Sequence, residues 1–107
     1  MREKKIEQRL MKAVRQSGGL CPKFVSPGTA GMPDRIVMLP GGQLGFVEVK
    51  APGKKTRCLQ EKRHKQLQEL GFRVFVLDCM EQIPDILCQM GVNRNDAIED
   101  DVCGCDG

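Results

Sequence analysis

Residues 31–50, GMPDRIVMLPGGQLGFVEVK, decide the fold expected for this chain of 107 residues. Two apolar runs, at residues 36–39 and 44–49, flank the short connector Pro40-Gly41-Gly42. Apolar runs joined by a few turn-forming residues predict an antiparallel β-hairpin. Such a hairpin would return the end of the second strand to the beginning of the first.

Charged side chains gather at the open end of this predicted hairpin. Side chains alternate between the two faces of a strand, so Glu48 and Lys50 are expected on the same face. Asp34, at the start of the first strand, would lie close to both. Paired carboxylates suit Mg²⁺ or Mn²⁺, and the backbone carbonyl of Val49 is well placed to add a further oxygen ligand.

The other predicted elements surround the hairpin. Residues 3–17 predict an amphipathic helix, because the apolar side chains fall within one arc of a helical wheel. Thr56 is a plausible N-cap for a second helix. The full set comprises helix 3–17, an edge strand at 20–25, the hairpin, helix 57–70, a buried strand at 73–78 and a short helix at 81–90. The order α-β-β-β-α-β-α predicts an α/β fold of the α+β type, a mixed sheet flanked by helices.

Charge divides the chain into a basic body and an acidic tail. Residues 1–93 hold 16 of the 17 Lys and Arg residues, and residues 94–107 have a net charge of −4. We expect one folded domain at residues 1–92 and a flexible tail at 93–107. A basic body is typical of proteins that bind nucleic acid, although a solvated basic surface is an equal alternative on charge alone. No spanning segment or signal peptide is predicted, which indicates a cytoplasmic protein without a membrane partner.

The six cysteines do not form a recognisable metal motif. No C-x-x-C pair occurs, and His64 is the only histidine. In an intracellular protein the thiols are expected to be reduced. A small zinc or thiol protein is therefore a weak alternative for this chain.

Three further features can extend the cluster at the hairpin. Glu7 lies at the edge of the apolar face of the first helix, where a carboxylate must be paired or coordinated. It would be a third acidic ligand if this helix packs across the open end of the hairpin. The alternative is a salt bridge within the helix, with Lys4 or the neighbours of Met11. Gln60, on the next helix, could hold water or substrate. A basic loop would bind flanking phosphates through Lys54, Lys55 and Arg57.

Each of these features has an ordinary structural interpretation when taken alone. An E-x-K pair on a strand is usually a solvated pair of opposite charges, and Asp after Pro is often a turn residue. Gln60 could be a surface residue. The order and spacing of all of them on the predicted elements make the combined case stronger.

This combination resembles the VRR-NUC family of the PD-(D/E)xK nuclease superfamily, which has a restriction-endonuclease-like core. The matching residues are Glu7, Gly31-Met32-Pro33-Asp34, Glu48-Val49-Lys50 and Gln60. The resemblance covers about residues 1–90, and the acidic tail has no counterpart in the pattern. It implies a nuclease that requires Mg²⁺ or Mn²⁺ and hydrolyses phosphodiester bonds in DNA.

The resemblance also implies roles for individual residues. Glu7, Asp34, Glu48 and the Val49 carbonyl would bind the metal, Lys50 would be the catalytic lysine, and Gln60 would assist. DNA contacts would come from Lys54, Lys55, Arg57 and Arg35. The chain looks like the compact phage and bacterial members, which commonly act as homodimers. A homodimer suits four-way Holliday junctions or other branched DNA.

Two alternatives to a junction nuclease stay open at this point. One is a nuclease on linear duplex or DNA ends without junction preference. The other is a DNA-binding module of the same fold that does not cut. Intact Asp34, Glu48 and Lys50 argue against the second.

Overall fold

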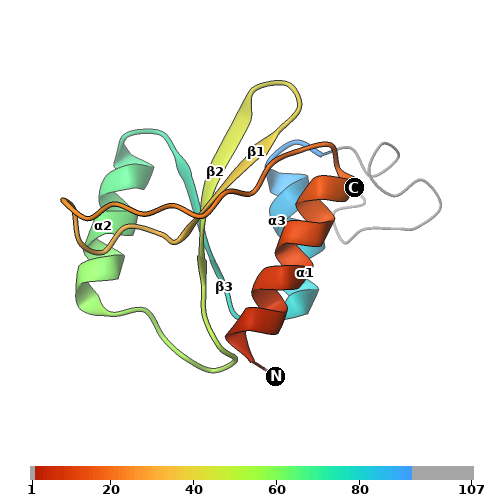
Figure 1. Cartoon of the computed structure of the whole chain (residues 1–107). Helices are drawn as coiled ribbons and strands as arrows, with labels where there is room; N and C mark the ends of the chain where they lie inside the picture. Colours follow the sequence, from red (N-terminus) through yellow and green to blue (C-terminus); the bar gives the residue numbers. More distant parts are fainter. Residues whose placement is uncertain (1, 93–107) are drawn as a thin grey trace.

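The computed structural model describes residues 2–92, in which a three-stranded sheet lies between two layers of helices (Figure 1). Helix α2 covers one face of the sheet, and α1 and α3 lie together on the other (Figure 1). The elements in chain order are α1 (Glu3–Gln16), β1 (Arg35–Leu39), β2 (Gln43–Val49), α2 (Cys58–Glu69), β3 (Arg73–Leu77), a 3₁₀ turn η1 (Met80–Gln82) and α3 (Ile83–Gln89).

The predicted hairpin is confirmed. Strands β1 and β2 pair antiparallel, with Arg35 opposite Val47 and Leu39 opposite Gln43. Gly41 and Gly42 both have positive φ angles, of 87° and 76°. This backbone region is accessible to glycine at little cost, which explains the tight connection at the end far from Asp34 and Glu48.

Strand β2 lies at the centre of the sheet and is buried on both faces. It pairs with β3 in parallel, and α2 forms the connection between the two strands. All five residues from Gly45 to Val49 are buried. Side chains alternate between the two faces of a strand, so Val47 and Val49 lie on one face of the sheet and Phe46 and Glu48 on the other.

The main core lies between the sheet and the layer of α1 and α3. Ile6, Leu10 and Val14 are spaced four residues apart on α1 and are fully buried. This spacing places them on one face of a helix. Their partners in the core include Val37, Leu39, Val47, Val49, Leu77, Ile83, Ile86, Leu87 and Met90. This packing fixes α1 beside the hairpin, as the apolar arc predicted.

The strand predicted at residues 20–25 is wrong as a regular element. Only isolated antiparallel bridges form there, Leu20 with Met38 and Lys23 with Arg35. Backbone hydrogen bonds still run along this segment, and the carbonyl of Pro22 accepts one from the N–H of Ile36. Pro22 has no N–H to donate, which interrupts the ladder on this edge of β1.

The N-cap predicted for α2 is also wrong. The helix begins at Cys58, so its N-cap is Arg57 rather than Thr56. The hydroxyl of Thr56 instead donates a hydrogen bond to Glu61 at 3.0 Å. The backbone N–H of Arg57 is satisfied by the side-chain oxygen of Gln60 at 2.9 Å. A residue three positions into the helix thus completes the cap.

Two other expectations concern membrane-spanning segments and the oxidation state of the cysteines. Within residues 2–92, no helix is long and apolar enough to cross a membrane. The prediction of reduced cysteines holds for Cys21, Cys58 and Cys79 but is wrong for Cys88, which is disulfide-bonded. The tail predicted at 93–107 lies outside the described residues.

Candidate active site

Asp34 is held against the end of β2 by a loop fastened to α2. Gly31 has a φ of 84°, and a Cβ atom there would lie 2.8 Å from the carbonyl oxygen of Leu59. Arg63 of α2 donates a hydrogen bond to the carbonyl of Ala30 at 3.1 Å. Only glycine fits this close approach without strain. The loop then delivers Asp34, whose Oδ1 accepts the backbone N–H of Val49 at 3.2 Å.

The side chain of Glu48 is buried and lies close to two nitrogen donors. The residue is only 4% exposed. Its Oε2 accepts a hydrogen bond from Nε2 of Gln60 at 3.0 Å and lies 3.5 Å from Nζ of Lys50. The predicted grouping of Glu48, Lys50 and Gln60 is therefore present, with Asp34 against the next residue of the same strand.

Gln60 has a fixed orientation because both ends of its amide are occupied. Its oxygen accepts from the N–H of Arg57, and its nitrogen donates to Glu48. An amide offers two donors and one oxygen acceptor, so this pattern assigns the side-chain orientation. Gln60 thereby ties the first turn of α2 to the carboxylate of Glu48.

The two central carboxylates resist ionisation. Burial raises the pKa of Asp34, and the charges of Glu7 and Glu3 raise it further, while the Val49 N–H opposes the shift. Burial likewise raises the pKa of Glu48, and the charge of Asp34 adds to the rise, while Lys50 opposes it. Like charges near each other in a partly buried site disfavour the ionised forms. A cation placed between them would remove this penalty.

Glu7 reaches the same end of the sheet but is paired with Arg35. Nε of Arg35 lies 2.8 Å from Oε2 of Glu7, and Nη1 of Arg35 donates to the carbonyl of Cys21 at 2.9 Å. Glu7 is therefore in a salt bridge in this structure, but its partner is Arg35 of β1 rather than a residue of its own helix. Its proposed role as a ligand, and the DNA contact proposed for Arg35, stay predictions.

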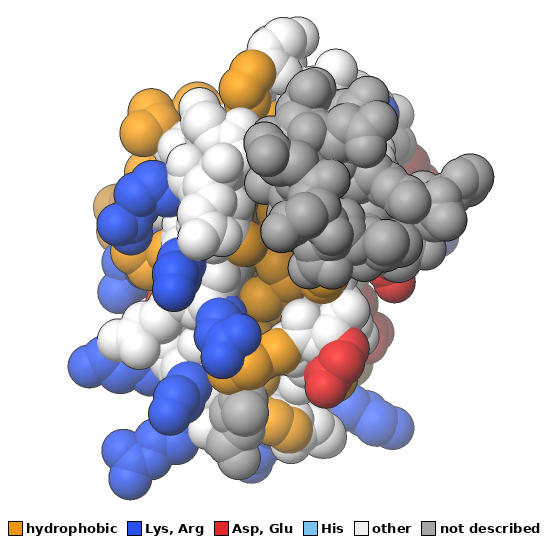
Figure 2. All heavy atoms as spheres, turned by 90° about the vertical axis from the view of Figure 1, so that its right-hand side faces the viewer, with side chains coloured by type: hydrophobic (Ala, Val, Ile, Leu, Met, Phe, Trp, Pro, Cys, Tyr) orange, Lys and Arg blue, Asp and Glu red, His pale blue; other side chains and the backbone are white. Residues whose placement is uncertain are grey.

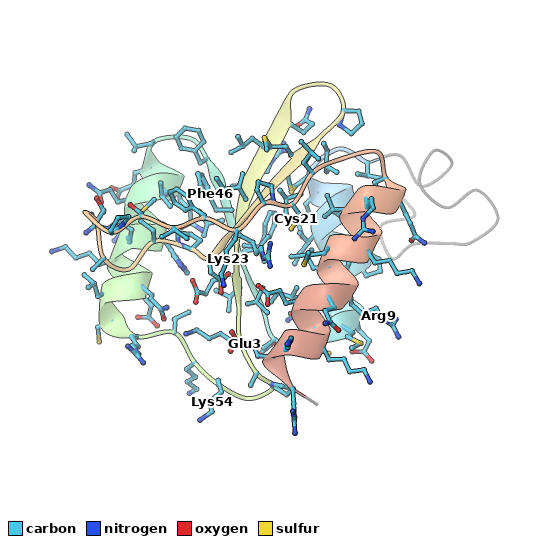
Figure 3. The ribbon with its side chains drawn as sticks, viewed as in Figure 1. Glu3, Arg9, Cys21, Lys23, Phe46 and Lys54 are labelled. Atoms are coloured by element: carbon cyan, nitrogen blue, oxygen red, sulfur yellow. The ribbon has the colours of Figure 1, made fainter. Side chains whose placement is uncertain are left out.

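Exposed basic side chains lie on the loop after Lys50 and on a separate surface of the molecule. The loop after Lys50 exposes Lys54, Lys55 and Arg57, and Lys54 lies at the end of the molecule where α1 begins (Figure 3). Further Lys and Arg side chains gather over α1, whereas α3 carries none (Figure 2). Arg9 points away from the sheet on this outer side (Figure 3). The positive charge that would attract a polyanion is thus present on more than one surface of the molecule.

The described side chains supply some, but not all, of the ligands that a divalent cation needs. No group of three His, Cys, Asp or Glu side chains between residues 2 and 92 is arranged to hold a metal ion. Asp34 and Glu48 do provide two hard oxygen donors whose mutual repulsion a cation would relieve. Mg²⁺ and Mn²⁺ commonly use one or two carboxylates and complete their coordination with water and phosphate oxygens. This donor set therefore suits such an ion.

Comparison with known proteins identifies the family. No family model matches the sequence. A protein of Acyrthosiphon pisum secondary endosymbiont phage 1 named "Putative nuclease p44" is 49% identical over 81 residues, which cover 76% of this chain and 87% of that protein. A solved structure described as "VRR_NUC domain" superimposes with a TM-score of 0.75 at 30% identity, covering 79% of this chain and 92% of that one. The chain belongs to the VRR-NUC family.

Membership in the VRR-NUC family confirms the fold expected from the hairpin. The mixed sheet with helices on both faces is the PD-(D/E)xK-like nuclease fold. The hairpin, the first helix and α2 are therefore elements of this fold, as the sequence pattern predicted.

Two residues near the site of this VRR-NUC protein were missed in the sequence. Glu3 affects the pKa of both Asp34 and Glu48, and His64 lies 4.0 Å from Glu48. Helical spacing could have found them. Glu3 precedes Glu7 by four residues and His64 follows Gln60 by four, so each shares a helix face with a residue already singled out.

The raised pKa values predict how stability depends on pH in the metal-free protein. A carboxylate with a raised pKa contributes stability below its unfolded-state pKa and loses it as pH rises through the folded-state pKa. Glu48→Gln keeps the shape without the charge. Its melting temperature relative to wild type should therefore increase between about pH 4 and pH 7. Thermal melts across this range measure the effect.

The matched control is Glu69→Gln, because Glu69 is exposed near the end of α2. It should follow the wild-type pH profile. A constant offset between Glu48→Gln and wild type at every pH would contradict the prediction.

Proposed function

We propose that this VRR-NUC protein is a metal-dependent DNA endonuclease that hydrolyses phosphodiester bonds. The observation that carries the proposal is the contact of Lys50 and Gln60 with one oxygen of buried Glu48, beside a second carboxylate, Asp34. A structural salt bridge would not need a second carboxylate, Asp34, whose charge adds to burial in raising the pKa of Glu48. The arrangement is suited to an ion that brings positive charge to a phosphate.

Mg²⁺ or Mn²⁺ would be held by Asp34, Glu48 and the carbonyl of Val49. Glu7 would join this set when Arg35 releases or shares its carboxylate. When bound, the ion would neutralise phosphate oxygens and increase the acidity of a water molecule. Asp34 and Glu48 are hard oxygen donors, and this supports Mg²⁺ or Mn²⁺ over softer ions.

Lys50 and Gln60 would act on the reacting groups directly. The Lys50 side chain is 16% exposed, so its ammonium lies at the boundary between the buried carboxylate and solvent. From there it can orient the attacking water and stabilise negative charge that develops on the phosphate. Gln60 keeps Glu48 in place through its fixed amide, and its contact ties that carboxylate to α2.

The loop at residues 54–57 would bind the DNA backbone. We predict that Lys54→Ala combined with Lys55→Ala weakens DNA binding and lowers the slope of log affinity against log salt by about 0.9 for each lost phosphate contact. Fluorescence anisotropy with a labelled duplex at several salt concentrations, in the presence of Ca²⁺ to suppress cutting, measures this slope.

The matched control replaces Arg9 and Lys12, which are both exposed on α1. This pair removes the same charge from a different surface. An equal change in slope for both double variants would count against a specific role for the loop.

The preferred substrate within this proposal is branched DNA, cut by a homodimer. Strand β3 is at the edge of the described sheet, and Leu70, Phe72 and Val76 near it are exposed. An unpaired sheet edge with exposed apolar side chains in or near its strand supports contact with a second copy. Two sites in one dimer would address two strands of a four-way junction. A cytoplasmic location stays a prediction.

A substrate panel tests the function and separates its alternatives. Purified protein is incubated with labelled four-way junction, flap and linear duplex in EDTA, Mg²⁺ or Mn²⁺. Cutting that requires a metal supports the proposal, and binding without cutting under every condition would make the protein a non-cleaving module. Equal cutting of duplex and junction would remove the preference for branched DNA. Light scattering at micromolar concentration decides between monomer and dimer.

A further inference from the structure

The two oxygens of Glu48 have different surroundings. Oε2 is held by Gln60 and lies near Lys50. Oε1 is buried and makes no hydrogen bond within the described residues. Buried polar atoms in native proteins are nearly always paired, so an unpaired oxygen on a central carboxylate requires an explanation.

The atom facing this oxygen is equally unpaired. Nε2 of His64 lies 4.0 Å from Oε1 of Glu48 and is itself buried without a hydrogen-bond partner in the described part of the chain. His64 is 7% exposed and Glu48 is 4% exposed. Leaving both atoms unsatisfied would cost the desolvation of two polar groups. A small rotation of the imidazole or the carboxylate would bring them into hydrogen-bond distance.

The position of His64 on α2 explains why the two atoms meet. His64 follows Gln60 by one helical turn, and both residues face β2. Leu67 is also buried on α2 and anchors the helix beyond them. Gln60 and His64 therefore approach the same carboxylate from one rigid element, each toward a different oxygen.

We infer that His64 is a positioning residue for Glu48, with its Nε2–H directed at Oε1 while Gln60 holds Oε2. Neutral histidine can place its single proton on either nitrogen, and only the Nε2–H tautomer can donate to this oxygen. Groups that hold a ligating carboxylate tune its affinity for a metal without touching the metal. The expected effect on metal affinity rests on the proposed function, whereas the contact between His64 and Glu48 does not depend on that function.

The contact is tested first in metal-free protein without a histidine tag. His64 is the only histidine of the chain, so the imidazole ¹⁵N spectrum contains signals from one residue. We expect the Nε2–H tautomer at neutral pH and a changed Nε2 shift in Glu48→Gln. An Nδ1–H tautomer, or a spectrum that does not respond to Glu48→Gln, would overturn the inference whatever the protein does with metals or DNA.

The consequence for the metal site is tested by Mn²⁺ binding without DNA, from the electron paramagnetic resonance signal of free Mn²⁺. His64→Leu should weaken binding by about tenfold, the size seen for loss of an outer contact to a ligand. His64→Gln offers an amide N–H near the position of Nε2 and should restore most of the affinity. Thermal melts of both variants separate this effect from a general loss of fold.

The outcomes distinguish the inference from the proposed function. Wild-type affinity in His64→Leu, or an equal loss in both variants, would overturn the role of His64 while leaving a metal-dependent nuclease intact. A wild-type protein that neither binds Mn²⁺ nor cuts DNA would contradict the proposed function. In that case the imidazole spectrum still decides whether His64 holds Glu48.

Discussion

Lys50→Ala is expected to reduce the rate of DNA cleavage by about 10²–10³-fold, the loss typical of one donor to a developing negative charge. The physical reason is the location of its ammonium, 3.5 Å from Oε2 of Glu48 in a side chain that retains some solvent contact. Alanine removes the charge that the proposed mechanism places beside the reacting phosphate. Single-turnover cleavage of labelled DNA measures the rate of the chemical step.

The measurement should use saturating metal, because Lys50 also opposes the rise in the pKa of Glu48. Its removal would therefore change metal affinity as a secondary effect. Lys65→Ala is the matched control, since Lys65 is exposed on α2. Wild-type cleavage by Lys50→Ala at saturating metal would exclude Lys50 as the catalytic lysine.

Asp34→Asn should abolish metal binding while leaving the fold intact. Loss of a direct ligand is expected to exceed the cost of about 10–100-fold that follows loss of an outer contact. The amide oxygen of asparagine can still accept the N–H of Val49, so the local structure survives. Isothermal titration with Mn²⁺ and cleavage assays should both show the loss.

The stability of Asp34→Asn provides a second, independent readout. Asp34 and Glu48 repel each other, and this repulsion is absent in the variant. The metal-free variant should therefore melt at the wild-type temperature or higher, as is common when a strained functional site is neutralised. Mn²⁺ should raise the melting temperature of the wild type but not that of Asp34→Asn, because a ligand stabilises the state that binds it.

Asp85→Asn is the control for this experiment, because Asp85 is exposed on α3. It should respond to Mn²⁺ like the wild type. A Mn²⁺-induced rise in melting temperature for Asp34→Asn equal to that of wild type would show that Asp34 is not a ligand.

Local sequence determined the elements that carry the site. Residues 31–50 predicted a hairpin because alternation and the Pro40-Gly41-Gly42 turn act within a few residues. The same locality placed Glu48 and Lys50 on one face and Asp34 near them. The four-residue spacing of Ile6, Leu10 and Val14 likewise predicted α1 and the face that it buries. Local periodicity is the strongest signal in a single sequence.

Competition between neighbouring groups produced the errors in individual elements. Thr56 has the chemistry of an N-cap, but the side chain of Gln60 satisfies the N–H of Arg57 and the helix begins later. Residues 20–25 have the composition of a strand, yet Pro22 interrupts their pairing with β1. In the first case a competing side-chain hydrogen bond decided the outcome, and in the second a missing backbone donor did.

The sequence by itself thus determined the hairpin, the apolar face of α1 and the carboxylate–lysine pattern at the open end of the sheet. Only the tertiary structure decided how each charge is held. It paired Glu7 with Arg35, brought the amide of Gln60 to Oε2 of Glu48 and placed His64 opposite Oε1. These contacts join residues 28, 12 and 16 positions apart, and their formation depends on how α1 and α2 pack on opposite faces of one sheet. Packing of this kind is set by the whole core, which no local pattern contains.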